Sequence, residues 1–240
     1  MKNKFTIIIL LIVLVSGVLT AISFFSFDNK NVANQIDSIM EDPSGYENWL
    51  KNTRVVNSIE LEDFTSVNLD DLNYFVSFKE GPEFKMEISS TQSKPKIYGV
   101  ENIKVVGGVL NIPKLDLSDR TGISIYAKDL STISVDAKDI NGVMNIEGNL
   151  KNLKLNAING VLNIEAMDTF DIKIGSMNGL LNMEFAEKNA IFNLQNLNSV
   201  ANIFGKTMID FEDDKNMEII KGEGRDTITI ENINGFANIN

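Results

Sequence analysis

The stretch Asn159-Gly160-Val161-Leu162-Asn163-Ile164 decides the expected fold, because close copies of it recur through the second half of the chain. The other copies begin at Asn141, Asn178, Asn198 and Asn234. Successive starts at 141, 159, 178 and 198 lie 18, 19 and 20 residues apart, and 234 follows 198 by 36, or two periods of 18. A fixed period of this size is typical of stacked structural units that stabilise one another.

A second apolar run precedes each copy, as Leu153-x-Leu155 does before Asn159. Asn-Gly between alternating hydrophobic residues is the strongest short signal for a β-hairpin, so an antiparallel meander is one interpretation. The other is a coiled chain that turns a corner at Asn-Gly and rises one strand spacing per turn, so that like residues stack. Stacking alone explains why an asparagine recurs within an otherwise apolar segment, and we therefore expect an all-β single-stranded parallel β-helix, or β-solenoid, with turns of 17–20 residues.

In such a stack, asparagines at the same place in successive turns can form an amide ladder, each donating to one neighbour and accepting from the other. The predicted ladder consists of Asn145, Asn163, Asn182, Asn202 and Asn238. The predicted corners are Asn141 and Gly142, Asn159 and Gly160, Asn178 and Gly179, and Asn234 and Gly235.

The N-terminal residues 5–25 carry no charge and follow Lys2 and Lys4 directly. A helix of that length spans about 30 Å, the thickness of a bilayer core. The apolar run is longer than the core of a usual cleavable signal peptide, and the basic residues precede it. We therefore expect a transmembrane signal anchor over residues 1–27, a cytoplasmic N-terminus, and a single-pass cell-membrane protein whose C-terminal domain is extracytoplasmic.

Residues 28–52 are predicted to form a polar, partly helical spacer before a repeat domain over residues 53–240. Four apolar residues are spaced for one face of a short helix, namely Val32, Ile36, Ile39 and Met40. The segment is interpreted either as a stalk or as a cap over the exposed edge of the first strand.

The overall composition excludes several kinds of function. Asp and Glu outnumber Lys and Arg by 33 to 22, a net charge of −11 that disfavours nucleic acid as a partner. The chain has no Cys and no His, which removes disulfides, thiolate metal sites and His-dependent catalytic triads. We accordingly expect no enzyme activity, no catalytic residues, no cofactor and no metal site.

Three segments are candidate sites. The acidic loop over residues 210–214 could bind Ca²⁺, but it lacks the spacing of a recognised calcium loop and is expected to be a solvated insertion. Asp116, Asp119 and Arg120 could serve a carboxylate-based enzyme, although a surface ion pair is the commoner outcome. Gly222-Glu223-Gly224 precedes a strand rather than a helix, so it predicts a turn and not a phosphate site.

The strand block and the repeats together resemble a known family. Gly107-Gly108-Val109-Leu110-Asn111-Ile112, interpreted as a sixth copy of the motif, precedes two strand-like segments over residues 123–126 and 130–135 and then the Asn-Gly repeats. This arrangement, over about residues 55–240, resembles the bacterial "putative adhesin" family of β-strand repeat proteins, which is related to the head domain of auto-transporter adhesins and is often membrane-anchored. The resemblance implies a right-handed β-solenoid exposed at the cell envelope and assigns no catalytic residue.

The expected function is a non-enzymatic, membrane-anchored module for binding, adhesion or envelope structure. Alternatives are a carboxylate-based polysaccharide-active enzyme and an accessory protein that senses envelope stress. The expected partners are the membrane, through the N-terminal helix, and an envelope protein or polysaccharide. The last motif ends one residue before Asn240, so we also expect an uncovered final strand, which could favour an end-to-end homo-oligomer.

Overall fold

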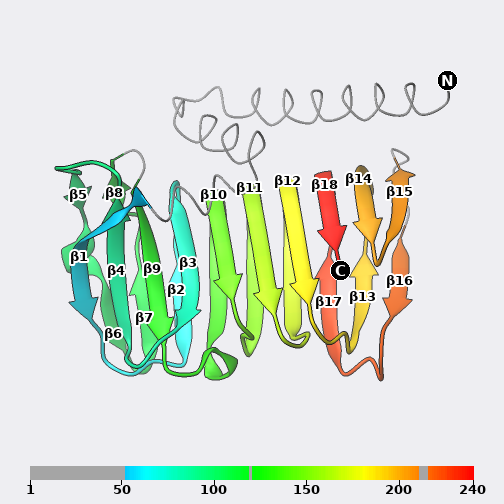
Figure 1. The fold of residues 1–240 in the computed structure, drawn as a ribbon, viewed down its shortest axis with the longest axis horizontal. Helices are drawn as coiled ribbons and strands as arrows, with labels where there is room; N and C mark the ends of the chain where they lie inside the picture. The colour runs from blue at the N-terminus through cyan, green and yellow to red at the C-terminus, as the bar shows by residue number, and fades with distance from the viewer. Residues whose placement is uncertain (1–51, 119–120, 211–215) are drawn as a thin grey trace.

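A computed structural model describes residues 52–118, 121–210 and 216–240 of the chain (Figure 1). The first part contains β1 (Arg54–Glu60), β2 (Ser66–Leu69), β3 (Phe75–Glu80), β4 (Lys85–Ser90), β5 (Ile97–Tyr98), the 3-10 turn η1 (Val100–Asn102), β6 (Lys104–Val106), β7 (Val109–Ile112), β8 (Asp116–Leu117), β9 (Thr121–Ala127) and the 3-10 turn η2 (Leu130–Thr132). The second part contains β10 (Ser134–Glu147), β11 (Asn152–Ala166), β12 (Asp171–Phe185), β13 (Ala190–Leu194), β14 (Leu197–Ile203), β15 (Lys206–Asp210), β16 (Met217–Ile220), β17 (Asp226–Ile230) and β18 (Ile233–Ile239).

The predicted fold class of the repeat domain, a right-handed single-stranded parallel β-helix, is wrong. The structure is a large mixed sheet, in which β1–β4, β4–β9, β6–β7, β13–β16 and β14–β15 are antiparallel pairs. These pairs lie towards the two ends of the sheet, where the sequence lacks the motif or departs from its period. The periodicity therefore predicts the parallel register of the strands that carry the motif, but not the antiparallel pairs at the two ends.

The middle of the sheet consists of β10, β11 and β12, which pair in parallel with like residues opposite one another. Asn141 lies opposite Asn159, and Asn159 opposite Asn178. The same register extends to β3 on one side and to β18 on the other. The Asn-Gly pairs of these strands lie inside continuous strands and do not form hairpins.

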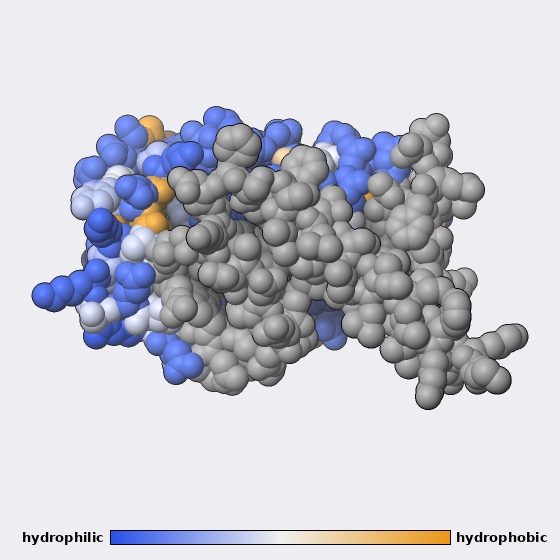
Figure 2. Space-filling model, turned by 90° about the horizontal axis from the view of Figure 1, so that it is seen from above, coloured by the Kyte–Doolittle hydropathy of each residue, from blue (hydrophilic) through white to orange (hydrophobic). Residues whose placement is uncertain are grey.

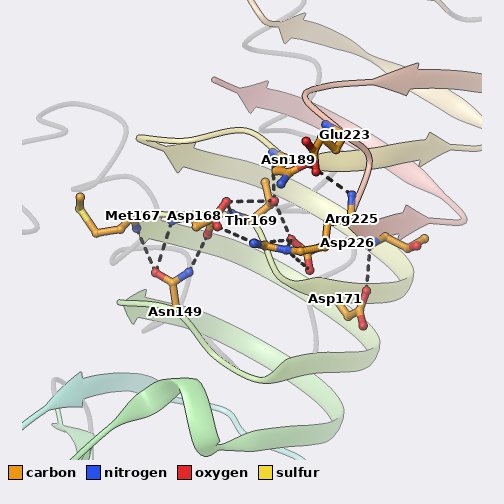
Figure 3. Close-up of polar contacts among 10 residues, drawn as sticks. Asn149, Met167, Asp168, Thr169, Asp171, Asn189, Glu223, Arg225 and Asp226 are labelled. Atoms are coloured by element: carbon orange, nitrogen blue, oxygen red, sulfur yellow. Dashed lines mark hydrogen bonds and ion pairs between the residues drawn. The ribbon is translucent and has the colours of Figure 1, made fainter.

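Each long strand bends back on itself, as the ribbons in Figure 3 show. Ser134 at the start of β10 pairs with Asn152 at the start of β11, and only residues 148–151 connect the end of β10 to that point. A straight strand of 14 residues would be about 46 Å long, which a link of four residues cannot span. The two halves of the strand therefore face one another across a single core, to which both contribute.

The core follows the alternation of side chains along the strands. In β11, Leu153, Leu155, Ile158, Leu162 and Ile164 are all buried. The alternation changes phase between Leu155 and Ile158, where the strand changes direction. At the C-terminal end aromatic rings replace part of this aliphatic core, and the rings of Phe170, Phe185, Phe192 and Phe204 contact one another in sequence.

Spatial order departs from sequence order at the N-terminal end of the sheet. β2 and β3 pair with the two halves of β10, while β7 and β9, which follow them in the chain, pair on their far side. The segment 107–112 is therefore not a sixth copy of the motif. Leu110 lies opposite Val67 in β2, and Val67 lies opposite Val135, which belongs to the apolar run before the motif. Gly107 and Gly108 both have positive φ and connect the antiparallel strands β6 and β7, as in a two-residue hairpin of type I′.

The order also departs at the C-terminal end. β18, the last strand of the chain, lies between β12 and β14 and pairs in parallel with both (Figure 1). β17 lies in the same way between β12 and β13. The last repeat is thus inserted into the stack, and the expected uncovered final strand is not found; the strand order of the sheet ends at β1 and at β16.

Among the residues that the structure describes, no helix is long and apolar enough to cross a membrane. The predicted single-pass anchor over residues 1–27 and the cell-membrane localisation derived from it thus find no support in the described part of the chain, and residues 5–25 themselves lie outside the described ranges. The described surface visible in Figure 2 is mostly hydrophilic, with a few hydrophobic residues at the end that carries β1 and β5. Val55, Tyr98 and Val106 are among the exposed large hydrophobic residues.

Candidate functional site

The outer face of the motif half of the sheet carries three parallel columns of like residues. The first contains the corner asparagines, with Asn73 at its beginning. The second is apolar and comprises Phe75, Val143, Val161, Leu180 and Phe236, in spatial order. The third begins at Ser77 and continues through Asn145, Asn163, Asn182, Asn238 and Asn202. Successive members of a column are separated by the strand spacing of about 4.8 Å.

The corner column is a continuous file of hydrogen-bonded amides. Each amide nitrogen donates to the oxygen of the preceding strand: Asn141 to Asn73 at 3.3 Å, Asn159 to Asn141 at 2.9 Å, Asn178 to Asn159 at 2.8 Å, and Asn234 to Asn178 at 3.0 Å. Each interior member therefore both donates and accepts within the file. One amide hydrogen and one lone pair per residue lie outside these bonds.

The third column, where the sequence predicted the ladder, is linked over only part of its length. Asn202 donates to Asn238 at 2.8 Å, and Asn238 donates to Asn182 at 2.7 Å. Asn145 instead donates to Glu147 at 2.7 Å, and among the described contacts no hydrogen bond joins Asn163 to either neighbour. The structure thus brings together three of the five asparagines through their amides, and the longest file consists of the predicted corner residues.

Glycine is required beside the corner asparagines because successive turns approach one another closely. Gly160 has φ +148°, and a Cβ there would overlap the carbonyl oxygen of Gly142; Gly179 and Gly235 stand in the same relation to the glycine before them. Gly142 itself lies against the backbone of Tyr74, which takes the first place in this column. The glycines allow the asparagine amides to approach within hydrogen-bond distance.

A fourth column, of carboxylates, borders the face. Glu147, Glu165 and Glu184 lie opposite one another on β10, β11 and β12. Lys79 forms an ion pair with Glu147 at 2.8 Å, and Glu165 and Glu184 are exposed. Carboxylates at strand spacing repel one another, so this border favours a neutral or cationic ligand over an anionic one.

A separate polar cluster lies on the loops that precede β12, β13 and β17 (Figure 3). Arg225 donates to Asp168 and to Asp226, with N–O distances of 2.5 and 3.0 Å, and the hydrogen bonds to these two carboxylates, that to Asp226 first, raise its pKa. Thr169, only 2% exposed, donates to Asp226 at 3.0 Å and accepts from the backbone nitrogen of Asn189 at 3.2 Å. The cluster links three loops around the inserted repeat through hydrogen bonds and ion pairs. This geometry indicates a structural rather than a catalytic role.

Other candidates from the sequence lie apart from these features. Asp116 lies in β8, whereas residues 119–120 and 211–215 are outside the described ranges. In the part of the chain that the structure describes, no group of three or more Asp or Glu side chains is arranged to hold a metal ion. Gly222 and Gly224, both with positive φ, form a turn in which the nitrogen of Glu223 donates to Asn189.

Sequence reasoning missed the role of two sets of residues. The corner asparagines were given a conformational role only, although they recur as regularly as the predicted ladder. Arg225, Asp168 and Asn189 carry no periodic signal, because each loop contributes different residues. No pattern in the sequence indicates that residues 168 and 225, which are 57 positions apart, form an ion pair.

No protein-family model matches the chain, and no curated protein matches it. Solved structures that are similar include a putative cell adhesion protein from Clostridium sporogenes, with 14% identity, 78% of this chain and 96% of that chain covered, and a TM-score of 0.43. A putative adhesin from Bacteroides fragilis has 10% identity over the same shares, with a TM-score of 0.26. A structure from Parabacteroides distasonis described as a putative lipid binding protein has 14% identity, covers 62% of this chain and 70% of that one, and has a TM-score of 0.29. Likenesses of this degree assign neither a function nor a site to this chain.

Proposed function

We propose that the chain is a non-enzymatic binding module that recognises an extended, neutral polysaccharide on its outer face. The face repeats an amide, an apolar side chain and a second amide at every strand from β10 to β18. Amides can donate to and accept from hydroxyl groups, and the apolar side chains of the column that are at least partly exposed, Leu180 and Phe236, can pack against the faces of pyranose rings.

The observation that carries the proposal is the continuous file of corner amides. Because each amide is held by the ones beside it, its orientation is set before any ligand arrives, which reduces the loss of side-chain entropy on binding. The strand spacing of about 4.8 Å is comparable with the length of one sugar unit, so a linear glycan can meet equivalent groups along the stack.

The charge of the chain supports a neutral polymer. The net charge is −11, and the border of the face carries Glu165 and Glu184. An anionic polymer would be repelled at this border, whereas a neutral one loses nothing by approaching it.

A binding assay with soluble glucan tests the proposal. Phe236, 36% exposed, belongs to the apolar column, and Ile220, 60% exposed, lies on β16 at the edge of the sheet. Phe236→Ala should weaken glucan binding about tenfold, equivalent to about 1.4 kcal/mol, while Ile220→Ala leaves it unchanged. Absence of binding to glucan and to other neutral polysaccharides, or equal weakening by both substitutions, would contradict the proposal.

A further inference from the structure

The half of the sheet formed by the apolar runs before the Asn-Gly motif is open at both ends. It passes from β6 through β7, β2 and the first halves of β10, β11 and β12 to β17, β13 and β16. Among the described residues, β6 pairs only with β7, and β16 only with β13. Figure 1 shows β6 near one end of the sheet and β16 at the other. An edge strand with an open side can pair with a strand of another chain.

The two edge strands run in the same direction. Every neighbouring pair from β7 to β13 in this half is parallel, whereas β6 is antiparallel to β7 and β16 is antiparallel to β13. When copies of the chain follow one another along the sheet, β16 of one copy therefore meets β6 of the next as a parallel strand. Such a contact joins two different surfaces of one chain, so it is head-to-tail.

The alternation of side chains along the two edges agrees in the parallel register that places Val105 opposite Ile219. Both of these residues are partly buried and pack against the core. The residues that follow them, Val106 and Ile220, are 57% and 60% exposed. The register thus places inward-facing side chains beside inward-facing ones, and it covers one exposed apolar side chain with another.

The charges of the two edges are opposite in the same register. Lys104 and Glu218, which precede the partly buried pair by one residue, are both exposed and would lie about 4.8 Å apart in adjacent strands. Opposite charges in this relation attract one another. A shift by one residue would reverse the faces of one strand, and a shift by two would place Lys104 opposite Ile220 or Asn216.

The backbone groups of the two edges are complementary as well. The nitrogen of Lys221 donates to the carbonyl oxygen of Ala190. By the alternation of an antiparallel pair, Glu218 and Ile220 then direct their backbone groups to the open side of β16. In β6, the two-residue turn that follows the strand leaves Val105 with its backbone groups on the open side. In the matched register Val105 can therefore donate to Glu218 and accept from Ile220, as parallel strands require.

We propose that copies of the chain associate head-to-tail, with β16 of one copy added in parallel to β6 of the next and Glu218 beside Lys104. The partner is a second copy because one edge supplies the charge, the apolar side chain and the backbone groups that the other edge matches. β1 and β15 are the corresponding end strands of the other half of the sheet. The association requires no ligand and therefore goes beyond the proposed polysaccharide binding.

Reversal of the two charges tests the contact in the full chain. Lys104→Glu and Glu218→Lys should each raise the dissociation constant of self-association at least about tenfold, because each places like charges side by side. Sedimentation velocity over a series of concentrations measures the constant. A 1:1 mixture of the two variants should associate as the unsubstituted chain does, since every contact between different variants again joins a lysine to a glutamate. Recovery in the mixture also shows that both variants are folded.

The matched control is Lys151→Glu, a charge reversal at an exposed position on the link between β10 and β11. It should leave self-association unchanged. An unsubstituted chain that stays monomeric at every concentration overturns the proposal, as does an association that neither edge substitution weakens or that the mixture fails to restore. Weakening by Glu218→Lys but not by Lys104→Glu would indicate that β16 contacts a second β16, and it would also overturn head-to-tail association.

Discussion

The central strands and the C-terminal strands of this sheet share one motif and one register but differ in continuity and order. β10, β11 and β12 each pass through a whole repeat as one strand and follow one another in space. The later repeats are divided into β13 and β14 and into β17 and β18, and the last lies inside the one before it. Amides mark the divisions, since Asn196 donates to Asn232, which donates to the carbonyl of Gly175.

The motif therefore determines the register of paired strands but not which strands become neighbours. Asn234 lies opposite both Asn178 and Asn198, so any copy presents the same pattern to any other. Order must come from residues outside the motif, such as the Arg225 cluster and the aromatic rings at the C-terminal end. The central stack should therefore be sensitive to substitutions in the motif, and the C-terminal region to substitutions in its loops.

The largest effect is expected from Gly160→Ala in the central stack. The residue has φ +148°, and a Cβ would overlap the carbonyl of Gly142, which is backbone and cannot move without shifting a whole turn. Backbone strain alone is about 1–3 kcal/mol, and the overlap should bring the loss of unfolding free energy above about 4 kcal/mol in urea denaturation. The matched substitution Gly205→Ala, at φ +76° with open space around it, should lose only about 1 kcal/mol. Similar losses at both glycines would show that close approach of the turns is not a constraint.

Truncation of one apolar side chain in each of the two regions compares how much their packing contributes to stability. Leu155 is 1% exposed in the central stack, whereas Ile219 on β16 is only partly buried. Leu155→Ala should lower the free energy of unfolding by about 2–5 kcal/mol, and Ile219→Ala by about 1 kcal/mol. Thermal and urea unfolding of the two variants measure this ratio, and a larger loss at Ile219 would place the stabilising core at the edge instead of the centre.

Thr169→Val tests whether the Arg225 cluster stabilises the inserted repeat. The substitution keeps the shape and removes a buried hydroxyl that bonds Asp226 and Asn189. Stability should fall by about 1–3 kcal/mol, and hydrogen exchange should accelerate in β17 and β18 more than in β11. Thr132→Val, which removes an exposed hydroxyl in η2 that donates to the carbonyl of Asp129, should change neither quantity measurably. Uniform acceleration across all strands would show that the cluster does not act on the last repeat in particular.

Asn159→Ala and Asn163→Ala, both in β11, distinguish the contributions of the two asparagine columns to stability. Asn159 donates at 2.9 Å and accepts at 2.8 Å within the corner file, so its loss should lower stability by about 1–2 kcal/mol. Asn163 has no such bond to its neighbours in the described structure and should lose less than about 0.5 kcal/mol. Urea denaturation of the pair decides whether the corner file or the third column is the stabilising ladder.

The contrast between the central and the C-terminal strands also shows which features of the fold can be predicted from the sequence. The alternation around Leu155 and the recurrence of Asn-Gly indicate strands, their register and an inward-facing core, because each of these depends on neighbours in the chain or on copies of one pattern. The antiparallel pairs of β1, β4 and β16 depend on contacts between segments without a shared pattern. The position of β18 between β12 and β14 could not be predicted, because all copies of the motif offer equivalent strands for pairing.

The candidate face was only partly predictable for a related reason. Stacking of Asn145 over Asn163 follows from register, but a hydrogen bond also requires the correct rotamer, and Asn145 bonds Glu147 instead. The amides of the corner residues Asn141 and Asn159 lie at a hydrogen-bond distance of 2.9 Å, because the glycines beside them bring the backbones together. Register is a property of the pattern, whereas amide geometry is a property of the local backbone.

The smallest expected effect is a gain, from Tyr74→Phe where the central stack meets the N-terminal strands. The Tyr74 hydroxyl is buried and has no hydrogen-bond partner among the described residues, so its removal should raise the free energy of unfolding by about 1 kcal/mol at neutral pH. Burial raises the pKa of this hydroxyl, because the folded protein favours the neutral form. A raised pKa means that the contribution of Tyr74 to stability is present below the unfolded value of about 10 and is lost as the pH rises above it. Urea denaturation at pH 7 and at about pH 10.5 should therefore show a larger advantage of the Phe variant at the higher pH, and since all other tyrosines are common to both proteins, an advantage independent of pH would mean that the hydroxyl is solvated in the folded state.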